Sequence, residues 1–266
     1  MLNLIASLRR YRYLVFELTK REFKDRYANQ VLGSAWACLH PLLLMLLYAS
    51  VFNFVFAMRF GENGVDLPRD YTTYVLSGLV PWLFLQDVLG RASDAILSHR
   101  SLVKQMAFPT NVLPVKRALS SLPILCIGAS FLVLYQIYMF GSLPWTILLW
   151  PAYMVLLVVF AIGLVFVIGS IGVYWRDLRE LIVVFISANL FLIPVLFPPN
   201  QTPRVLKAIF WLNPFSYPVW FHQDIMFYGS VVHPTAWILM SVVGAGTLLL
   251  GLAIYQRLSP QFGDVI

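Results

Sequence analysis

The sequence predicts an all-α integral membrane protein. Of its 266 residues, 60% are hydrophobic and only 12% are charged, whereas an ordinary soluble domain carries roughly 25% charged residues. The mean hydropathy of +0.77 fits a chain that is mostly buried in lipid. Long stretches without a formal charge alternate with short charged segments, as in proteins with several membrane-spanning helices. These observations exclude a water-soluble globule.

Residues 1–30 are predicted to form a cytoplasmic, amphipathic interfacial helix. Apolar side chains fall along one face at helical spacing, and basic side chains fall on the other face. The apolar residues are Leu4, Leu8, Tyr11, Val15 and Leu18, and the basic residues are Arg9, Arg10, Lys20, Arg21 and Lys24. Such a helix lies in the membrane interface with its basic face towards anionic headgroups. A soluble amphipathic helix docked on protein is the alternative.

Six membrane-spanning helices are predicted to follow. Each is an apolar segment long enough to cross the hydrocarbon core, and polar loops or turn residues separate the segments. The predicted spans are 31–58, 71–90, 118–140, 145–175, 181–197 and 235–256. Pro41 is expected to kink the first span. Asp87 lies near the end of the second span, where a boundary role is favoured over a proton relay.

Between the fifth and sixth spans, residues 203–230 are predicted to form short re-entrant helices. Residues 208–223 are uncharged and aromatic, but Asn213-Pro214 and Pro218 interrupt them, and the segment is short for a crossing. Helices that enter the membrane and return on the same side are therefore preferred. A seventh span is the alternative.

The distribution of basic residues predicts the orientation. Segments on one side of this arrangement hold 15 of the 19 Lys and Arg residues. Because cytoplasmic loops carry an excess of Lys and Arg, both termini are predicted to face the cytoplasm. A transmembrane domain then covers 31–257, and a cytoplasmic tail covers 258–266.

The sequence carries no motif of an enzymatic site. It has no Gly-Lys pair, hence no phosphate-binding loop for ATP, and no H-E-x-x-H, C-x-x-C or G-x-S-x-G motif. The 4 His and 2 Cys residues are scattered, so we assign no catalytic residue, metal or cofactor to this chain. His222 and Asp224 are expected to make an interfacial hydrogen bond rather than take part in metal or proton chemistry. The net charge of +7 is attributed to cytoplasmic loops, not to nucleic-acid binding.

Two segments are candidates for a role in transport. Tyr48, Phe52 and Phe56 recur at helical spacing on one face of the first span. Their rings would offer weak, repeated contacts to sugar or acyl groups in a conduit. Packing between helices or an aromatic belt at the membrane interface is the alternative. Residues 102–114 combine a short helical stretch, two prolines and Phe108. This composition suits a knob that docks in a groove of a partner, with a plain solvated loop as the alternative.

Several motifs, in order along nearly the whole chain, resemble those of ABC-2 type permeases that export polysaccharides. They are residues 18–27, 31–37, 77–82, 102–114 and 174–178, with His40-Pro41 and Asn213-Pro214. The resemblance implies the permease subunit of a bacterial inner-membrane exporter of lipid-linked polysaccharide. It is strongest to O-antigen exporters, with capsule and teichoic acid exporters as alternatives.

The resemblance also implies partners and roles. In this family two permeases pair with two ATPase subunits, which hold ATP and Mg²⁺, and membrane lipid surrounds the permeases. The implied ATPase-coupling residues are Lys104, Phe108, Pro109, Arg176 and Asp177, and the implied external gate includes Asn213, Pro214 and Pro218.

The alternative functions from other classes are a structural scaffold and a membrane-embedded lipid or sugar transferase. A transferase would need a clustered base or metal site, which the sequence does not show.

Overall fold

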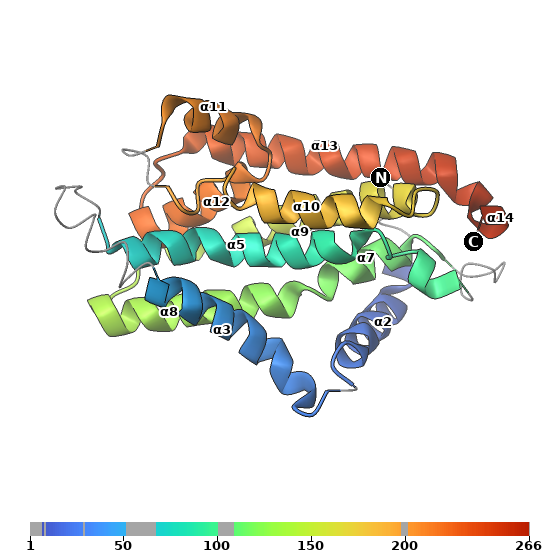
Figure 1. The fold of residues 1–266 in the computed structure, drawn as a ribbon, viewed down its shortest axis with the longest axis horizontal. Coiled ribbons are helices and arrows are strands. Elements are labelled where there is room, and N and C mark those ends of the chain that lie inside the picture. Colours follow the sequence, from blue (N-terminus) through green and yellow to red (C-terminus); the bar gives the residue numbers. More distant parts are fainter. Residues whose placement is uncertain are drawn as a thin grey trace.

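The computed structural model describes residues 7, 9–28, 30–51, 68–100, 109–197 and 202–265, and this part of the chain is helical with no strand. Its α-helices are α2 (Arg12–Asp25), α3 (Trp36–Val51), α5 (Tyr71–Ala92), α7 (Val112–Leu119), α8 (Leu122–Phe140), α9 (Trp150–Gly172), α10 (Leu178–Asn189), α11 (Arg204–Leu212), α12 (Ser216–Gln223), α13 (Pro234–Leu258) and α14 (Phe262–Val265). The long helices lie side by side along the longest axis of the molecule, and α2 crosses them obliquely (Figure 1). We call the end that holds α2 and α14 the α2 end of the bundle.

Within the described residues, three helical segments are long and apolar enough to cross a membrane. They are Val112–Phe140, Trp145–Gly172 and Pro234–Gln261, which coincide with the third, fourth and sixth predicted spans. Helix α3 covers the predicted first span as far as Val51, and residues 52–58 lie outside the described residues. Helix α10 ends at Asn189, before the predicted boundary at 197, because the chain turns irregularly through Pro194.

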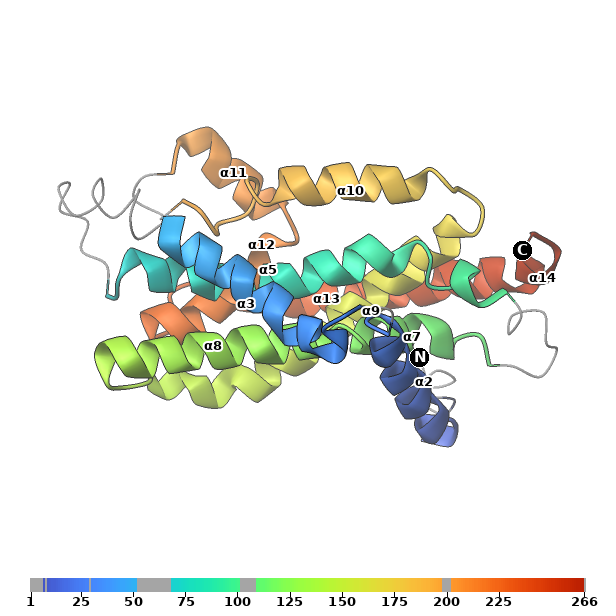
Figure 2. The same cartoon turned by 60° about the horizontal axis from the view of Figure 1, so that its bottom comes forward.

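Helix α5 is the central element of the bundle. It lies between α3 and α8 on one side and α10 and α12 on the other (Figures 1 and 2). Nearly every residue from Tyr71 to Leu85 is buried, including Thr72, Thr73 and Ser77. These polar residues make α5 less apolar than the three segments above. Burial within the protein compensates, since polar groups are tolerated at membrane depth where neighbouring helices enclose them.

Helices α9 and α13 approach each other closely through glycines. A Cβ atom on Gly163 would lie 2.5 Å from the Leu248 backbone nitrogen, and one on Gly251 would lie 2.7 Å from the Gly163 carbonyl oxygen. Small residues allow helix backbones to pack at such short distances in membranes, where van der Waals contact drives association. The α9–α13 pair therefore depends on the absence of side chains at these two positions.

Helix α2 packs on the bundle through its apolar face. Val15 is buried, and Tyr11 and Leu18 pack against the same cluster, which includes Val112 of α7 and Phe262 of α14. The face is therefore covered by protein, as in the alternative of a docked amphipathic helix. Two further apolar side chains of α2, Tyr13 and Phe16, remain 74% and 63% exposed. Leu4 and Leu8 lie outside the described residues.

The close α9–α13 packing makes a stability prediction. Gly163→Ala should lower the free energy of unfolding by about 1–3 kcal/mol, because the new methyl group meets backbone atoms and forces the helices apart. Gly246→Ala on α13 is the matched control, since no atom lies within 4 Å of its added Cβ. In the control, the free energy of unfolding should rise by up to about 1 kcal/mol, because alanine favours a helix more than glycine does. Thermal unfolding of the purified chain in detergent measures both, and equal stability of the two variants would contradict this packing.

Candidate functional site

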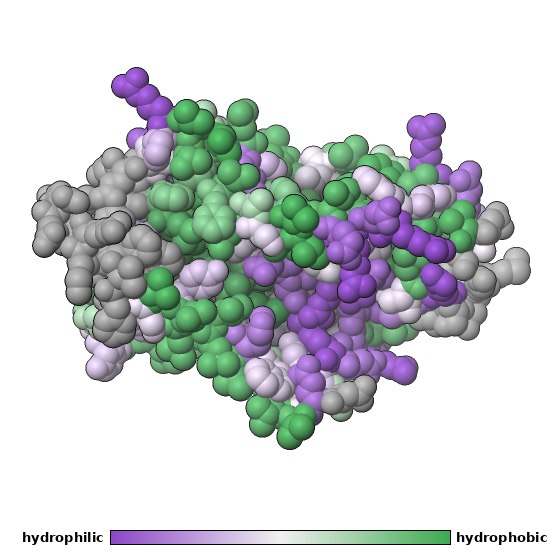
Figure 3. Space-filling model, in the orientation of Figure 1, coloured by the Kyte–Doolittle hydropathy of each residue, from purple (hydrophilic) through white to green (hydrophobic). Residues whose placement is uncertain are grey.

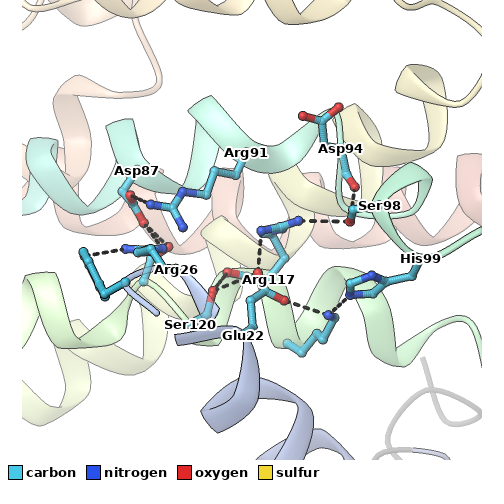
Figure 4. A network of polar contacts seen from close by, with 12 residues as sticks. Glu22, Arg26, Asp87, Arg91, Asp94, Ser98, His99, Arg117 and Ser120 are labelled. Atoms are coloured by element: carbon cyan, nitrogen blue, oxygen red, sulfur yellow. Dashed lines mark hydrogen bonds and ion pairs between the residues drawn. The ribbon is translucent and has the colours of Figure 1, made fainter. Parts of the chain in front are cut away.

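A network of buried ion pairs joins three helices at the α2 end of the bundle (Figure 4). Glu22 of α2 contacts the ammonium group of Lys116 at 2.7 Å and the guanidinium group of Arg117 at 2.5 Å, both from α7. The Ser120 hydroxyl also donates to the Glu22 carboxylate, at 3.3 Å. The side chains of Glu22 and Lys116 are only 11% and 2% exposed. Because this pair is shielded from water, a substitution that removes the charge of one partner would leave the other charge buried and unpaired.

Asp87 of α5 forms the second centre of this network. Its carboxylate accepts hydrogen bonds from Arg26 at 2.9 Å, Arg91 at 3.0 Å and the Ser121 hydroxyl at 2.6 Å. Arg26 follows α2 directly, so this centre ties the same helix to α5. Asp87 lies in the last part of α5 (Tyr71–Ala92). Its role at the membrane boundary stays a prediction.

The pKa values of two groups in the network, Glu22 and His99, are lowered by their surroundings. Burial acts to raise the pKa of Glu22, but the neighbouring charges of Arg117 and Lys116 outweigh it, so this pKa lies below the usual value of 4.5. Burial lowers the pKa of His99, and the positive charge of Lys116 lowers it further. His99 is therefore neutral at pH 7, and its ring nitrogen accepts a hydrogen bond from Lys116.

Two adjoining cavities open beside Asp87. One has a volume of about 600 Å³ and is lined by Arg26, Gln30 and Trp36 among others. The other has a volume of about 340 Å³ and extends between α3, α5 and α10. The residues that line both are His40, Pro41, Asp87, Arg91 and Ile124. We call the two together the α3–α10 cleft.

The structure describes one of the three predicted conduit residues. Tyr48 lies on α3, is half-buried, and packs against the central core. Phe52 and Phe56 lie outside the described residues. A conduit role for this face therefore stays a prediction.

The predicted ATPase-coupling residues are described in part. Lys104 and Phe108 lie outside the described residues, and the Pro109 carbonyl accepts a hydrogen bond from the Val112 backbone at 3.0 Å. Arg176 and Asp177 are exposed on the turn between α9 and α10. Arg176 also lines a polar cavity of about 440 Å³, which includes Asp94, Arg100 and Arg179. The structure thus brings the turn at Arg176 next to residues 93–100, which precede the predicted docking segment at 102–114.

Asn213 is the best anchored of the predicted gate residues. Its side-chain amide donates to Asn189 Oδ1 at 2.7 Å and to the Leu192 carbonyl at 2.9 Å, so the turn between α11 and α12 is tied to the end of α10. Pro214 is exposed beside it. Pro218 is buried in α12, and its carbonyl accepts a hydrogen bond from Tyr153 at 3.2 Å.

His222 and Asp224 both make hydrogen bonds, but with separate partners. The His222 ring contacts the Ser77 carbonyl at 2.5 Å. Asp224 is fully buried and accepts from the His233 backbone and ring, both at 2.8 Å, and from the Trp237 indole at 3.0 Å. The role of Asp224 is therefore to hold the start of α13 against α12.

Sequence reasoning missed the pairing of Glu22 with Lys116 and Arg117. The signal was present, because Lys116 and Arg117 stand directly before a long uncharged segment. Charges at the edge of an apolar helix need partners or water. What the sequence could not supply was the partner, since Glu22 is far away along the chain and sits in a segment rich in basic residues.

Glu22 supplies a test of the network. Glu22→Gln leaves Lys116 buried without a counter-charge, so we expect a loss of about 3–5 kcal/mol in the free energy of unfolding. Asp25→Asn is the matched control on the same helix, because the Arg21–Asp25 pair, at 3.5 Å, is 79% and 66% exposed. Its removal should cost less than about 1 kcal/mol. Denaturant unfolding in detergent compares the two, and an unaffected Glu22→Gln variant would contradict the role of this pair.

The same pair sets a pH dependence. Since the folded-state pKa of Glu22 lies below its usual value of 4.5, the stabilisation is complete above pH 4.5. It is lost as the pH falls through the folded-state pKa. Glu22→Gln should lack this component of the acid transition, while Asp25→Asn should retain it.

Comparison with known proteins identifies the family. The family described as ABC-2 type transporter matches residues 13–227. The O-antigen export system permease protein RfbA of Myxococcus xanthus is 29% identical over 272 aligned residues, which cover 100% of both chains. Two proteins of the same name from Klebsiella pneumoniae are 24% and 25% identical, with 95% of each chain covered. Because the family match spans most of the chain, this protein belongs to the ABC-2 type transporter family.

Proposed function

We propose that this chain is the membrane permease subunit of an ATP-driven exporter of lipid-linked polysaccharide of the O-antigen type, located in the bacterial inner membrane. The observation that carries the proposal is the alignment with the O-antigen export permease of Myxococcus xanthus over the full length of both chains. The family match and the apolar helical segments support a transporter subunit rather than a membrane-embedded transferase. ATP and Mg²⁺ belong to a separate ATPase subunit in this proposal.

The proposed topology has six spans and cytoplasmic termini. Two observations support it. Helices α2 and α14 pack in one cluster at the same end of the bundle, and 15 of the 19 Lys and Arg residues fall on the side assigned to the cytoplasm. Helices α11 and α12 form a hairpin in the half of the bundle away from the α2 end (Figure 1). Its turn at Asn213 meets the end of α10, as a re-entrant hairpin entering from outside would.

The α3–α10 cleft is the proposed wall of the conduit. Hydrophilic side chains gather on this face of the molecule, in the half that holds α2 and the start of α10 (Figure 3). Any part of this surface that enters the hydrocarbon region would be costly against lipid, so we place it against another protein or water. A second copy of this chain, set against this face, would enclose a polar path between the two permeases. Tyr48, Phe52 and Phe56 on the same first span are the aromatic contacts proposed for the passing polymer.

The proposed contact with the ATPase lies at the α2 end. Lys104, Phe108 and Pro109 form the proposed docking segment, and Arg176 and Asp177 form a second contact beside it. The cavity between residues 93–100 and 172–179 supports this pairing, because it brings the turn at Arg176 next to the residues that directly precede the docking segment. Two ATPase subunits and two permeases make up the proposed complex.

The proposed function is tested by complementation. A bacterium whose own O-antigen permease gene is deleted should regain surface polysaccharide when it expresses this chain with its cognate ATPase. Surface polymer is measured by immunoblot and by labelling of intact cells. The control carries an ATPase variant that binds but does not hydrolyse ATP, and it should accumulate polymer inside the cell. Accumulation inside despite an assembled, ATP-hydrolysing complex would contradict the proposal.

The gate role of the hairpin gives a separate prediction. Asn213→Ala removes both hydrogen bonds that tie the α11–α12 turn to α10, so the external end should open more often. We expect faster leakage of a small hydrophilic dye from proteoliposomes without ATP. Pro214→Ala is the matched control, because Pro214 is an exposed neighbour on the same turn. Equal leakage from the two variants would show that the hairpin does not close the conduit.

A further inference from the structure

Four cationic side chains share two carboxylates at the α2 end of the bundle. Among the described residues, Glu22 pairs with Lys116 and Arg117, and Asp87 pairs with Arg26 and Arg91. Arg91 is 31% exposed, and the other five side chains are at most 15% exposed. Buried charges are costly unless they are balanced. The excess of positive charge therefore favours an anion next to these side chains.

The two arginines at Asp87 have donors left for such an anion. Each reaches the carboxylate through one terminal nitrogen, at 2.9 Å for Arg26 and 3.0 Å for Arg91. The other terminal nitrogen of Arg26 donates to the Tyr27 hydroxyl at 3.4 Å. The Nε atom of Arg26 is buried and has no hydrogen-bond partner among the described residues, although the side chain is only 8% exposed. A guanidinium group carries five N–H donors in a planar fork that matches phosphate oxygens. Both arginines line the 600 Å³ cavity, so a ligand that enters it would lie next to their guanidinium groups.

The cleft changes from polar to apolar along its length. Its part next to Arg26 also holds Gln30 and His40. Its continuation between α3, α5 and α10 adds the apolar side chains of Leu44, Leu83 and Ile186, with Gln86 and Ser187 beside them. A charged head followed by a hydrocarbon chain matches this order, whereas an inorganic anion alone would use only the polar part.

We propose that Arg26 and Arg91 bind the phosphate group of a lipid, whose hydrocarbon chain lies along Leu44, Leu83 and Ile186. Two lipids carry this chemistry, namely an anionic phospholipid of the membrane and a lipid diphosphate that would carry the exported polymer. The second source rests on the proposed function. The phosphate site itself does not, because it follows from the charges and the cleft.

Binding is tested with the full-length protein in neutral detergent. Native mass spectrometry measures the affinity for phosphatidylglycerol and for undecaprenyl diphosphate, with diacylglycerol and undecaprenol as controls that keep the chains but lack phosphate. Arg91→Gln should weaken binding of both phosphate lipids about tenfold, since it removes a charged hydrogen-bond donor. Arg21→Gln is the matched control, because it removes an equal charge from an exposed ion pair on α2. It should bind as the unmodified protein does.

A conservative variant guards against misfolding. Arg91→Lys keeps the charge and a donor for Asp87 but loses the fork that contacts two phosphate oxygens. It should weaken binding severalfold while thermal unfolding is unchanged. Unaltered binding in both Arg91 variants would overturn the proposal, and so would equal binding of the lipids without phosphate or an equal loss in Arg21→Gln.

The same measurements separate the two sources. Tighter binding of undecaprenyl diphosphate than of phosphatidylglycerol assigns the site to the exported lipid. Equal or tighter binding of phosphatidylglycerol assigns it to a resident membrane lipid, and both results support a phosphate site. If Arg91→Gln loses lipid binding but restores surface polysaccharide normally, the site serves membrane lipid and the proposed function stands. If lipid binding is as expected but the unmodified protein exports no polymer, the proposed function fails and the phosphate site remains.

Discussion

The rest of the structure depends on the enclosure of α5. This helix carries polar and charged side chains along a segment long enough to cross a membrane, and they are acceptable there only if other helices cover them. The covering is close. Tyr74 donates to the carbonyls of Pro194 and Phe197 at 3.1 and 3.0 Å, and an added Cβ on Gly78 would lie 3.0 Å from the Gln223 side chain. The irregular segment after α10 and the hairpin helix α12 are therefore both positioned by α5.

The buried ion pairs extend this arrangement to the amphipathic helix α2. Apolar contacts at Val15 would fix its depth but not its direction, since hydrophobic packing is not directional. Two charged anchor points on one helix, Glu22 to α7 and Arg26 to Asp87 of α5, define the direction as well. A displacement of α2 must either break these pairs or carry α5 and α7 with it. In a transporter driven by a separate ATPase subunit, these pairs would couple a movement of α2 at the surface to α5 in the centre of the bundle.

The other half of the bundle is held by polar groups of a different kind. The segment Asp224–Tyr228 is a π-helix, in which the backbone bonding of the preceding α12 is interrupted. Two of its carbonyls accept hydrogen bonds from side chains. Thr146 donates to the Ile225 carbonyl at 2.6 Å, and Gln136 donates to the Met226 carbonyl at 2.8 Å. Asp224 then anchors the first turn of α13. Lipid cannot hydrogen-bond these backbone carbonyls, so the side chains must do so. This allows a short, interrupted helix to lie within the bundle.

The sequence by itself determined the class of fold and most of the helix positions, because hydropathy and charge act locally along the chain. Uncharged segments predicted spans at 118–140, 145–175 and 235–256, which coincide with the helical segments Val112–Phe140, Trp145–Gly172 and Pro234–Gln261. The ordered motifs indicated the family. The end of α10 at Asn189 was missed, although Pro194 shortly after it is a local signal against a helix that continues to 197. The pairing of Glu22 with Lys116 and the α3–α10 cleft were decided only by the tertiary structure. Ion pairs and cavities require residues from separate helices to meet at a few ångströms, and no periodicity within one segment specifies which helices those are.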